Sequence, residues 1–171
     1  IEKGSVIASG GSATIEEIGL LNYIKTHSEE YTFIDRSIAK NEEEKRQIHA
    51  KAILSDYYLM STNAFTMDGQ LVNIDGNGNR VSALCYGPKH VVIITGMNKL
   101  TPSVEDAYKR IRQDACPPNC VRLGLPTPCS KTGVCGDCMS ASSICDLFVT
   151  TRMSRYPDRI HIIMVGEELG Y

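Results

Sequence analysis

The sequence concentrates its most reactive side chains in one segment. Six of the seven cysteines lie between Cys116 and Cys145, and four of them have the spacing Cys129-x5-Cys135-x2-Cys138-x6-Cys145. Two thiolates two residues apart can bind one metal, and four sulfur ligands suit tetrahedral zinc or an iron–sulfur cluster. The spacing matches neither the regular zinc-ribbon nor the ferredoxin pattern, so the metal stays open. We interpret these four cysteines as candidate metal ligands, with disulfides or buried free thiols as the alternatives.

The remaining cysteines are less informative about chemistry. Cys116 and Cys120 are spare thiols or a pair formed on oxidation, and Cys85, in an apolar stretch, is predicted to lie in the core. An odd number of cysteines beside an ordinary α/β pattern is typical of a reducing compartment. No signal peptide is visible, although the chain begins with Ile1 rather than Met, so this absence counts for little. We expect a cytoplasmic location.

A glycine-rich turn near the start of the chain could bind an anion. Gly10, Gly11 and Ser12 stand between a predicted strand and a predicted helix. Glycine lets the backbone approach a ligand closely, and the first turn of a helix offers unpaired N–H groups with positive dipole character. The later Gly and Lys positions of a dinucleotide fingerprint or a P-loop are missing. The alternative is a tight strand-to-helix turn in which serine only caps the helix.

A second polar loop follows in the stretch NAFTMDGQLVNIDGNGNR, which begins at residue 63. Gly76 allows a convoluted backbone, and Asn77 and Asn79 offer directional hydrogen-bond donors. Arg80 can bind both oxygens of a carboxylate or a phosphate with its planar guanidinium. The alternative is a solvated turn with a surface arginine. The functional interpretation depends on this loop and the Gly10 turn meeting in one sheet.

Candidates for acid–base catalysis are few. Glu167 follows the last predicted strand, where a carboxylate could act as a base or a nucleophile, but adjacent acids at a strand end are also typical of a solvated terminus. The four histidines share no ligand spacing, and we assign none of them a role. The sequence therefore does not decide whether the protein is an enzyme.

The pattern of elements predicts an α/β fold that brings these groups together. Short apolar strands alternate with amphipathic helices, which indicates a mostly parallel sheet covered on both faces, in a three-layer α/β/α Rossmann-like arrangement. Asp68-Gly69 predicts a β-hairpin that adds an antiparallel pair to this sheet. Strands are expected at 5–9, 31–34, 57–60, 65–67, 70–74, 91–95 and 160–165, and helices from 14, over 41–54 and after Ser103.

One domain over residues 1–171 accounts for the whole chain, with residues 116–145 as a cysteine-rich loop insertion of little periodicity. Hydrophobic residues make up 42% and charged residues 22%, as in an ordinary globular protein. The formal net charge is −2 with no long basic run, which argues against nucleic acid as a partner. The apolar runs are as short as strands, so we expect no membrane span.

Three stretches resemble the short, cysteine-containing LUD-domain proteins, known as lactate-utilisation proteins: STNAFTMDGQLVNIDGNGNRVSALCYGP, TPCSKTGVCGDCMSASSIC and the ending VGEELGY. The resemblance implies a fold similar to the ribose-phosphate isomerase, glucosamine-phosphate deaminase and coenzyme A transferase group. It implies that Gly10–Ser12 is a ligand loop, that Asn63 and residues 75–80, including Asp75, border the same cleft, and that the four spaced cysteines are a subgroup feature. The glutamate loop of coenzyme A transferases and the acidic motif of the isomerases have no counterpart here.

Two functions remain open. The first is a component of lactate or organic-acid utilisation that binds a small anionic ligand or coenzyme between the Gly10 loop and Arg80. Its cysteines would hold zinc or an iron–sulfur cluster, and its partners would be other lactate-oxidation proteins. The alternative is a non-catalytic binding or regulatory module whose cysteines form a structural zinc site or a redox sensor. A sugar-phosphate isomerase or transferase ranks last, and the sequence leaves the oligomeric state, including a homo-oligomer, open.

Overall fold

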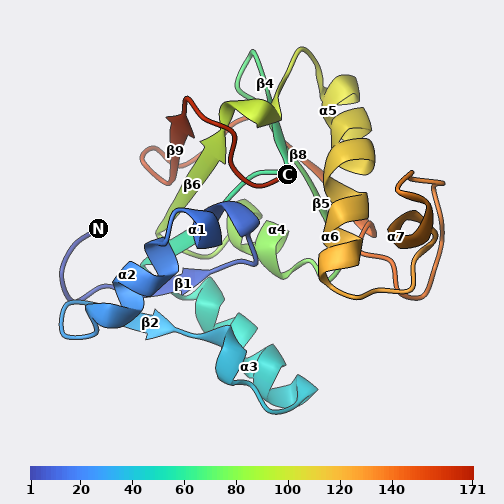
Figure 1. Ribbon diagram of the computed structural model, residues 1–171. Helices are drawn as coiled ribbons and strands as arrows, with labels where there is room; N and C mark the ends of the chain where they lie inside the picture. Colours follow the sequence, from blue (N-terminus) through green and yellow to red (C-terminus); the bar gives the residue numbers. More distant parts are fainter.

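A computed structural model describes all residues, 1–171, as a mixed α/β structure with two β-sheets (Figure 1). The larger sheet has five parallel strands in the order β2-β1-β3-β6-β9. The strands are β1 (Val6–Ser9), β2 (Thr32–Ile34), β3 (Tyr57–Met60), β6 (His90–Gly96) and β9 (Ile160–Val165). All five lie within one residue of the predicted runs at their starting ends. The expected mostly parallel sheet is confirmed.

Helices cover both faces of this sheet, as a three-layer arrangement requires. Alternate residues of β1 and β3 point to opposite faces, so Ile7 and Leu59 pack with Ile24 on one side, whereas Ala8 and Tyr58 belong to the cluster on the other. The first side is covered by α1 (Ala13–Glu17) and α2 (Leu20–Thr26), and the second by α3 (Glu42–Ile53) and α4 (Asn79–Cys85). The predicted amphipathic alternation of strands and helices therefore produces the expected layers.

The smaller sheet corrects the prediction that the hairpin extends the parallel sheet. Its order is β7-β4-β5-β8, formed by β4 (Ala64–Thr66), β5 (Leu71–Asp75), β7 (Leu100–Thr101) and β8 (Leu147–Thr151). The β4–β5 hairpin is antiparallel as predicted, and Gly69 has the positive φ of +86° that its turn requires. Only residues 61–63 separate β3 from β4. The chain therefore passes directly from one sheet to the other, and the junction faces the candidate site.

A continuous helical rod packs against the smaller sheet, which corrects the expectation of a loop beginning at Cys116. Helix α5 (Val104–Arg110), capped by Ser103 as predicted, continues through a π-helical turn (Ile111–Ala115) into α6 (Cys116–Arg122). Pro117 and Pro118 fall in the first turn of α6, where a missing N–H is tolerated. The short helix α7 (Pro128–Thr132) follows, and the rest of the cysteine-rich segment to residue 146 contains no regular element.

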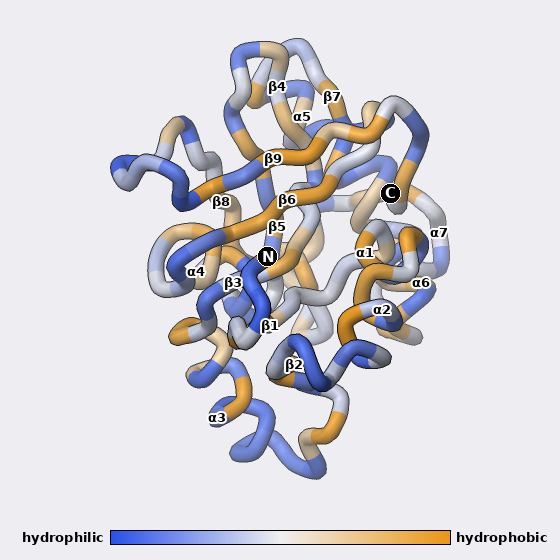
Figure 2. The backbone as a smooth tube through the Cα atoms, turned by 90° about the vertical axis from the view of Figure 1, so that its left-hand side faces the viewer, coloured by the Kyte–Doolittle hydropathy of each residue, from blue (hydrophilic) through white to orange (hydrophobic).

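Two further helical predictions need correction. The helix expected from residue 14 is divided into α1 and α2, because Gly19 adopts a positive φ of +70° between them. Helix α4 was not predicted, since the Gly- and Asn-rich stretch before it conceals its start. Figure 2 shows the hydrophobic strands β6 and β9 running side by side. None of the helices combines the length and apolar character needed to cross a lipid bilayer.

Candidate functional site

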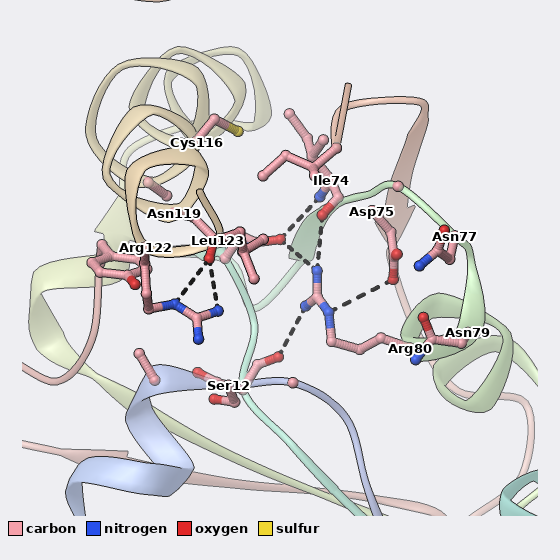
Figure 3. A pocket seen from close by; sticks show the side chains of 18 of the residues that line it. Ser12, Ile74, Asp75, Asn77, Asn79, Arg80, Cys116, Asn119, Arg122 and Leu123 are labelled. Carbon is pink, nitrogen blue, oxygen red and sulfur yellow. Dashed lines mark hydrogen bonds and ion pairs between the residues drawn. The ribbon is translucent and has the colours of Figure 1, made fainter. Parts of the chain in front are cut away.

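A cavity of about 310 Å³ opens where several strands end. Gly11–Thr14 follow β1, Ser61–Asn63 follow β3, and Lys99 lies just beyond β6. These three parallel strands end at one edge of the larger sheet. Strand β5 of the smaller sheet ends with Asp75 at the same place, so Asp75–Asn79 join segments that are far apart in the sequence. Residues of α3 and α6 also line the cavity, and Figure 3 shows those of α6.

The structure brings the predicted ligand-binding residues together. Eight of the nine line this cavity: Gly11, Ser12, Asn63, Asp75, Gly76, Asn77, Asn79 and Arg80. The ninth, Gly10, lies directly behind them, where an added Cβ would sit 3.1 Å from the Arg80 Cγ and 3.2 Å from the Tyr58 hydroxyl oxygen. Close packing, rather than an unusual φ, therefore calls for glycine at this position.

The Gly10 turn uses part of its hydrogen-bonding capacity internally. The Gly10 amide donates to the carbonyl oxygen of Leu59 at 3.0 Å, and the Ser12 hydroxyl caps α1 by accepting from the Ile15 amide at 3.3 Å. The sequence left open whether this turn is a ligand loop or only a capped connection between a strand and a helix. In the structure it is such a capped connection, and it also borders the cavity. Gly11 and Ser12 form that border.

Arg80 is more deeply engaged with the protein than the sequence suggested. Its side chain is only 12% exposed, and its Nε lies 3.7 Å from a carboxylate oxygen of Asp75. Its terminal nitrogens donate hydrogen bonds of 2.7–3.2 Å to four oxygens, those of Ser61 O, Asn73 Oδ1, Asn63 Oδ1 and Ile74 O. Figure 3 shows the guanidinium between Ile74 and Asp75. The guanidinium therefore ties the end of β3 to β5. It supplies positive charge to the cavity wall, but its donors are already occupied.

Lys99 is the functional candidate that sequence reasoning missed. Its side chain reaches the cavity although the residue is only 3% exposed, and its Nζ donates to the hydroxyls of Thr14 at 2.8 Å and Ser61 at 3.2 Å. No carboxylate lies within ion-pair distance of Nζ. Burial, helped by the charges of Arg110 and Arg80, lowers the pKa of Lys99 to about 8. At neutral pH this is a buried positive charge without a counter-ion.

A signal for Lys99 exists in the sequence. It stands four residues after the predicted strand 91–95, at the sheet edge where ligands of open α/β folds bind. A lysine in a short turn at that edge could have been included with the Gly10 and Arg80 loops.

The cavity as a whole is cationic. Five of its lining residues are lysines or arginines, whereas Asp75 has the single acidic side chain among them. Besides Arg80 and Lys99 they are Arg36, Lys45 and Arg122. The Arg36 guanidinium packs over Gly11, where an added Cβ would lie 2.7 Å from its Nη2, and Arg122 donates to the side-chain oxygen of Asn119 (Figure 3). Such a surplus of positive charge favours an anionic ligand.

His49 of α3 adds an imidazole to the lining of the cavity. Burial, together with the charges of Arg36 and Lys45, lowers the pKa of His49 below its usual value. Its Nε2 atom is buried and has no hydrogen-bond partner within the protein, and the Tyr171 hydroxyl at the cavity has none either. Each is a buried polar atom whose hydrogen-bonding capacity the protein leaves unused.

The four spaced cysteines do not fit a metal centre in this structure. No group of three or more His, Cys, Asp or Glu side chains is arranged to hold a metal ion. Cys129 is buried beside Cys120, whose pKa is raised by burial, and by Cys129, to about 11. Cys135 lies next to Arg112, and Cys145 contacts Cys116 instead of its predicted co-ligands. The spacing of the four cysteines along the chain therefore does not arrange their sulfur atoms as one set of metal ligands.

The structure also shows where Cys85 and Glu167 lie. Cys85, expected in the core, is exposed at the last residue of α4, on the solvent side of that helix. Glu167 is exposed beyond β9 and does not line the cavity; its carbonyl oxygen accepts a hydrogen bond from the Met97 amide at 3.1 Å. The carboxylate of Glu167 is thus not among the groups that could touch a ligand there.

These observations define an α/β protein whose parallel strands end at a cationic cavity. The chain belongs to the LUD-domain family, whose model matches residues 1–165, and this family is linked in general to lactate utilisation. Among solved structures, the crystal structure of a DUF162 family protein from Deinococcus radiodurans is similar over 95% of this chain and 88% of that chain, at 12% sequence identity and a TM-score of 0.40. No curated protein matches the chain.

Proposed function

We propose that this LUD-domain protein acts in the cytoplasm in lactate or organic-acid utilisation by binding a small anionic metabolite or coenzyme in the cavity between β1, β3, β5 and β6. The observation that carries the proposal is Lys99, a charged side chain buried at the cavity without a carboxylate partner. A buried charge is unfavourable unless it is paired. A ligand carboxylate or phosphate would supply the missing counter-charge.

The surroundings of Lys99 support a polar, anionic ligand of modest size. A volume of about 310 Å³ lies at the lower end of the range for small-molecule sites. The Thr14 and Ser61 hydroxyls accept hydrogen bonds from the ammonium group, and Asn77 and Asn79 line the same cavity with amides. A hydroxy or oxo acid, with a carboxylate for Lys99 and an oxygen for these neutral donors, matches that set of groups.

The proposal is tested by calorimetric titration of the purified protein with lactate, pyruvate, a sugar phosphate and coenzyme A. We expect saturable binding of at least one of them, and a loss of about ten- to a hundredfold in affinity for Lys99→Met, because a hydrogen bond to a charged group contributes about 1.5–3 kcal/mol. Lys109→Met is the matched control, since Lys109 is exposed and pairs with Glu105 on α5. No binding of any anion, or equal losses in both variants, would contradict the proposal.

A second candidate, a non-catalytic regulatory module, is favoured by the contact between Cys116 and Cys145. The two functions separate on turnover: a module binds an anion, or responds to oxidation, without converting it. Incubation of the protein with lactate and an artificial electron acceptor, followed by assay for pyruvate, distinguishes them. Association with other lactate-oxidation proteins remains part of the first proposal and is tested by co-purification with them.

A further inference from the structure

Two cysteines that the metal interpretation treated separately lie in contact. The Sγ atoms of Cys116 and Cys145 are 3.3 Å apart, although 29 positions separate the residues in sequence. Cys116 is buried at the start of α6, whereas Cys145 is partly exposed at the end of the cysteine-rich segment. Cys145 is therefore the more accessible residue of the pair.

Ordered structure holds both residues in place. Cys116 packs in the cluster formed by the helical rod and the smaller sheet, next to Ile74 and Ala115. The Cys145 amide donates to the Ser143 hydroxyl at 3.0 Å, and the following amide, that of Asp146, donates to a carbonyl of the β5 strand at 3.2 Å. The contact between the thiols thus depends on the packing of α6 and β8 against β5.

The same two residues adjoin the cationic cavity. Cys116, Ser143 and Ile144 all line it. The backbone of Ile144 lies so close to Gly76 that a Cβ there would be 3.1 Å from the Ile144 Cα. A covalent bond between Cys116 and Cys145 would therefore fix the wall that faces the polar loop after β5.

We propose that Cys116 and Cys145 form a reversible intrachain disulfide when the protein meets a small-molecule disulfide such as oxidised glutathione. The more accessible Cys145 thiolate attacks one sulfur of that molecule and releases one reduced thiol. The Cys116 thiolate then attacks the mixed disulfide at the Cys145 sulfur and releases the second. In total the two cysteines lose two protons and two electrons, and the small-molecule disulfide gains them as two thiols. This inference does not depend on the proposed anion-binding function.

The experiment compares the reduced protein with protein treated with oxidised glutathione, after alkylation of the remaining thiols and peptide mass mapping. We expect one linked peptide pair containing Cys116 and Cys145, a loss of two alkylated positions of seven, and full reversal by dithiothreitol. Mapping of wild-type protein makes the result independent of whether a cysteine variant folds. A link between Cys120 and Cys129 instead, or no link at all, would overturn the proposal.

Two variants and a metal assay sharpen the test. Cys145→Ser should abolish the linked pair, whereas Cys138→Ser, which removes a cysteine outside this contact, should leave it unchanged. Elemental analysis of protein purified without air gives an independent check. Stoichiometric zinc, or iron with acid-labile sulfide, that protects Cys116 and Cys145 from alkylation would overturn the disulfide assignment, and metal-free protein with both thiols reactive supports it.

Discussion

The cavity and the cysteine-rich segment both contain residues that could take part in chemistry. The two regions differ in how the fold brings these residues together. Around the cavity, residues from four separate stretches converge because each stretch directly follows a strand. In the segment 116–145, cysteines close in sequence are dispersed over α6, α7 and a loop. The Cys116 and Cys145 thiols, which are in contact, come from the two ends of the segment. Strand order is therefore a better guide to proximity here than spacing along the chain.

The two regions also differ in how their polar groups are balanced. Arg80 is buried, and protein oxygens accept hydrogen bonds from its terminal nitrogens, so it links the two sheets. Lys99, a short distance away in the same cavity, has hydroxyl partners but no counter-ion. One cation stabilises the fold and the other is left for a ligand. The cysteine-rich segment contains no comparable unpaired buried charge, and its chemistry is confined to the thiols.

The largest expected effect is structural and concerns Arg80. We expect Arg80→Met to lower the free energy of unfolding by about 3–5 kcal/mol, because it leaves Asp75 and several buried oxygens without their partner. Urea unfolding followed by circular dichroism measures this. Arg46→Met, which removes an exposed arginine paired with Glu43, should change stability little. Similar losses of unfolding free energy in the two variants would show that the hydrogen bonds of Arg80 do not stabilise the link between the sheets.

The second effect is the pH dependence of stability due to Lys99. Its pKa is about 8 in the folded protein and near 10.5 in the unfolded chain, so between these values the unfolded state binds more protons. The free energy of unfolding should therefore rise with pH in this window, by roughly 3 kcal/mol in total. Unfolding curves at pH 7 to 10.5 should show this rise in wild-type protein relative to Lys99→Met. A constant difference between the two proteins across the window would refute it.

The third effect is the pH dependence of anion binding. An anion that pairs with Lys99 needs its ammonium form, so affinity should fall as pH increases above about 8, by up to tenfold per pH unit. Calorimetry with the ligand identified in the titrations, at pH 7, 8 and 9, measures this. Any anion binding that remains in the Lys99→Met variant should not weaken as the pH increases over this range. If wild-type affinity stays level over this range, Lys99 is not the counter-charge of the ligand.

The smallest effect compares a glycine from each region. Gly78 and Gly133 both have φ between +74° and +79°, so alanine is strained at both, by about 1–2 kcal/mol. At Gly78 an added Cβ would also meet the Leu147 Cδ1 at 2.8 Å, whereas at Gly133 nothing lies within 4 Å. Gly78→Ala should therefore lower the thermal midpoint more than Gly133→Ala. If Gly133→Ala lowered the thermal midpoint more, the loop after β5 would accommodate an added Cβ more easily than the cysteine-rich segment.

Local features of the sequence predicted much of the fold. Short apolar runs marked every strand of the larger sheet, Asp68-Gly69 marked the hairpin, and Asn41 and Ser103 marked two helix starts that they do cap. Each of these signals acts through neighbouring residues, by side-chain alternation, by a positive φ or by a cap. The Gly10 turn and the Asn-rich loop were also predicted to meet, in one sheet. They do meet at the cavity, although β1 belongs to the larger sheet and β5 to the smaller one.

Other features were decided only when distant segments packed. The sequence by itself determined the element types and the edge of the sheet at which polar loops gather. The tertiary structure decided that the hairpin belongs to a second sheet, that α5 runs on into α6, and that Cys145 meets Cys116. It also decided that Arg80 is saturated while Lys99 is not. Burial and counter-charge depend on atoms from several strands at once, so residue type and spacing do not contain them.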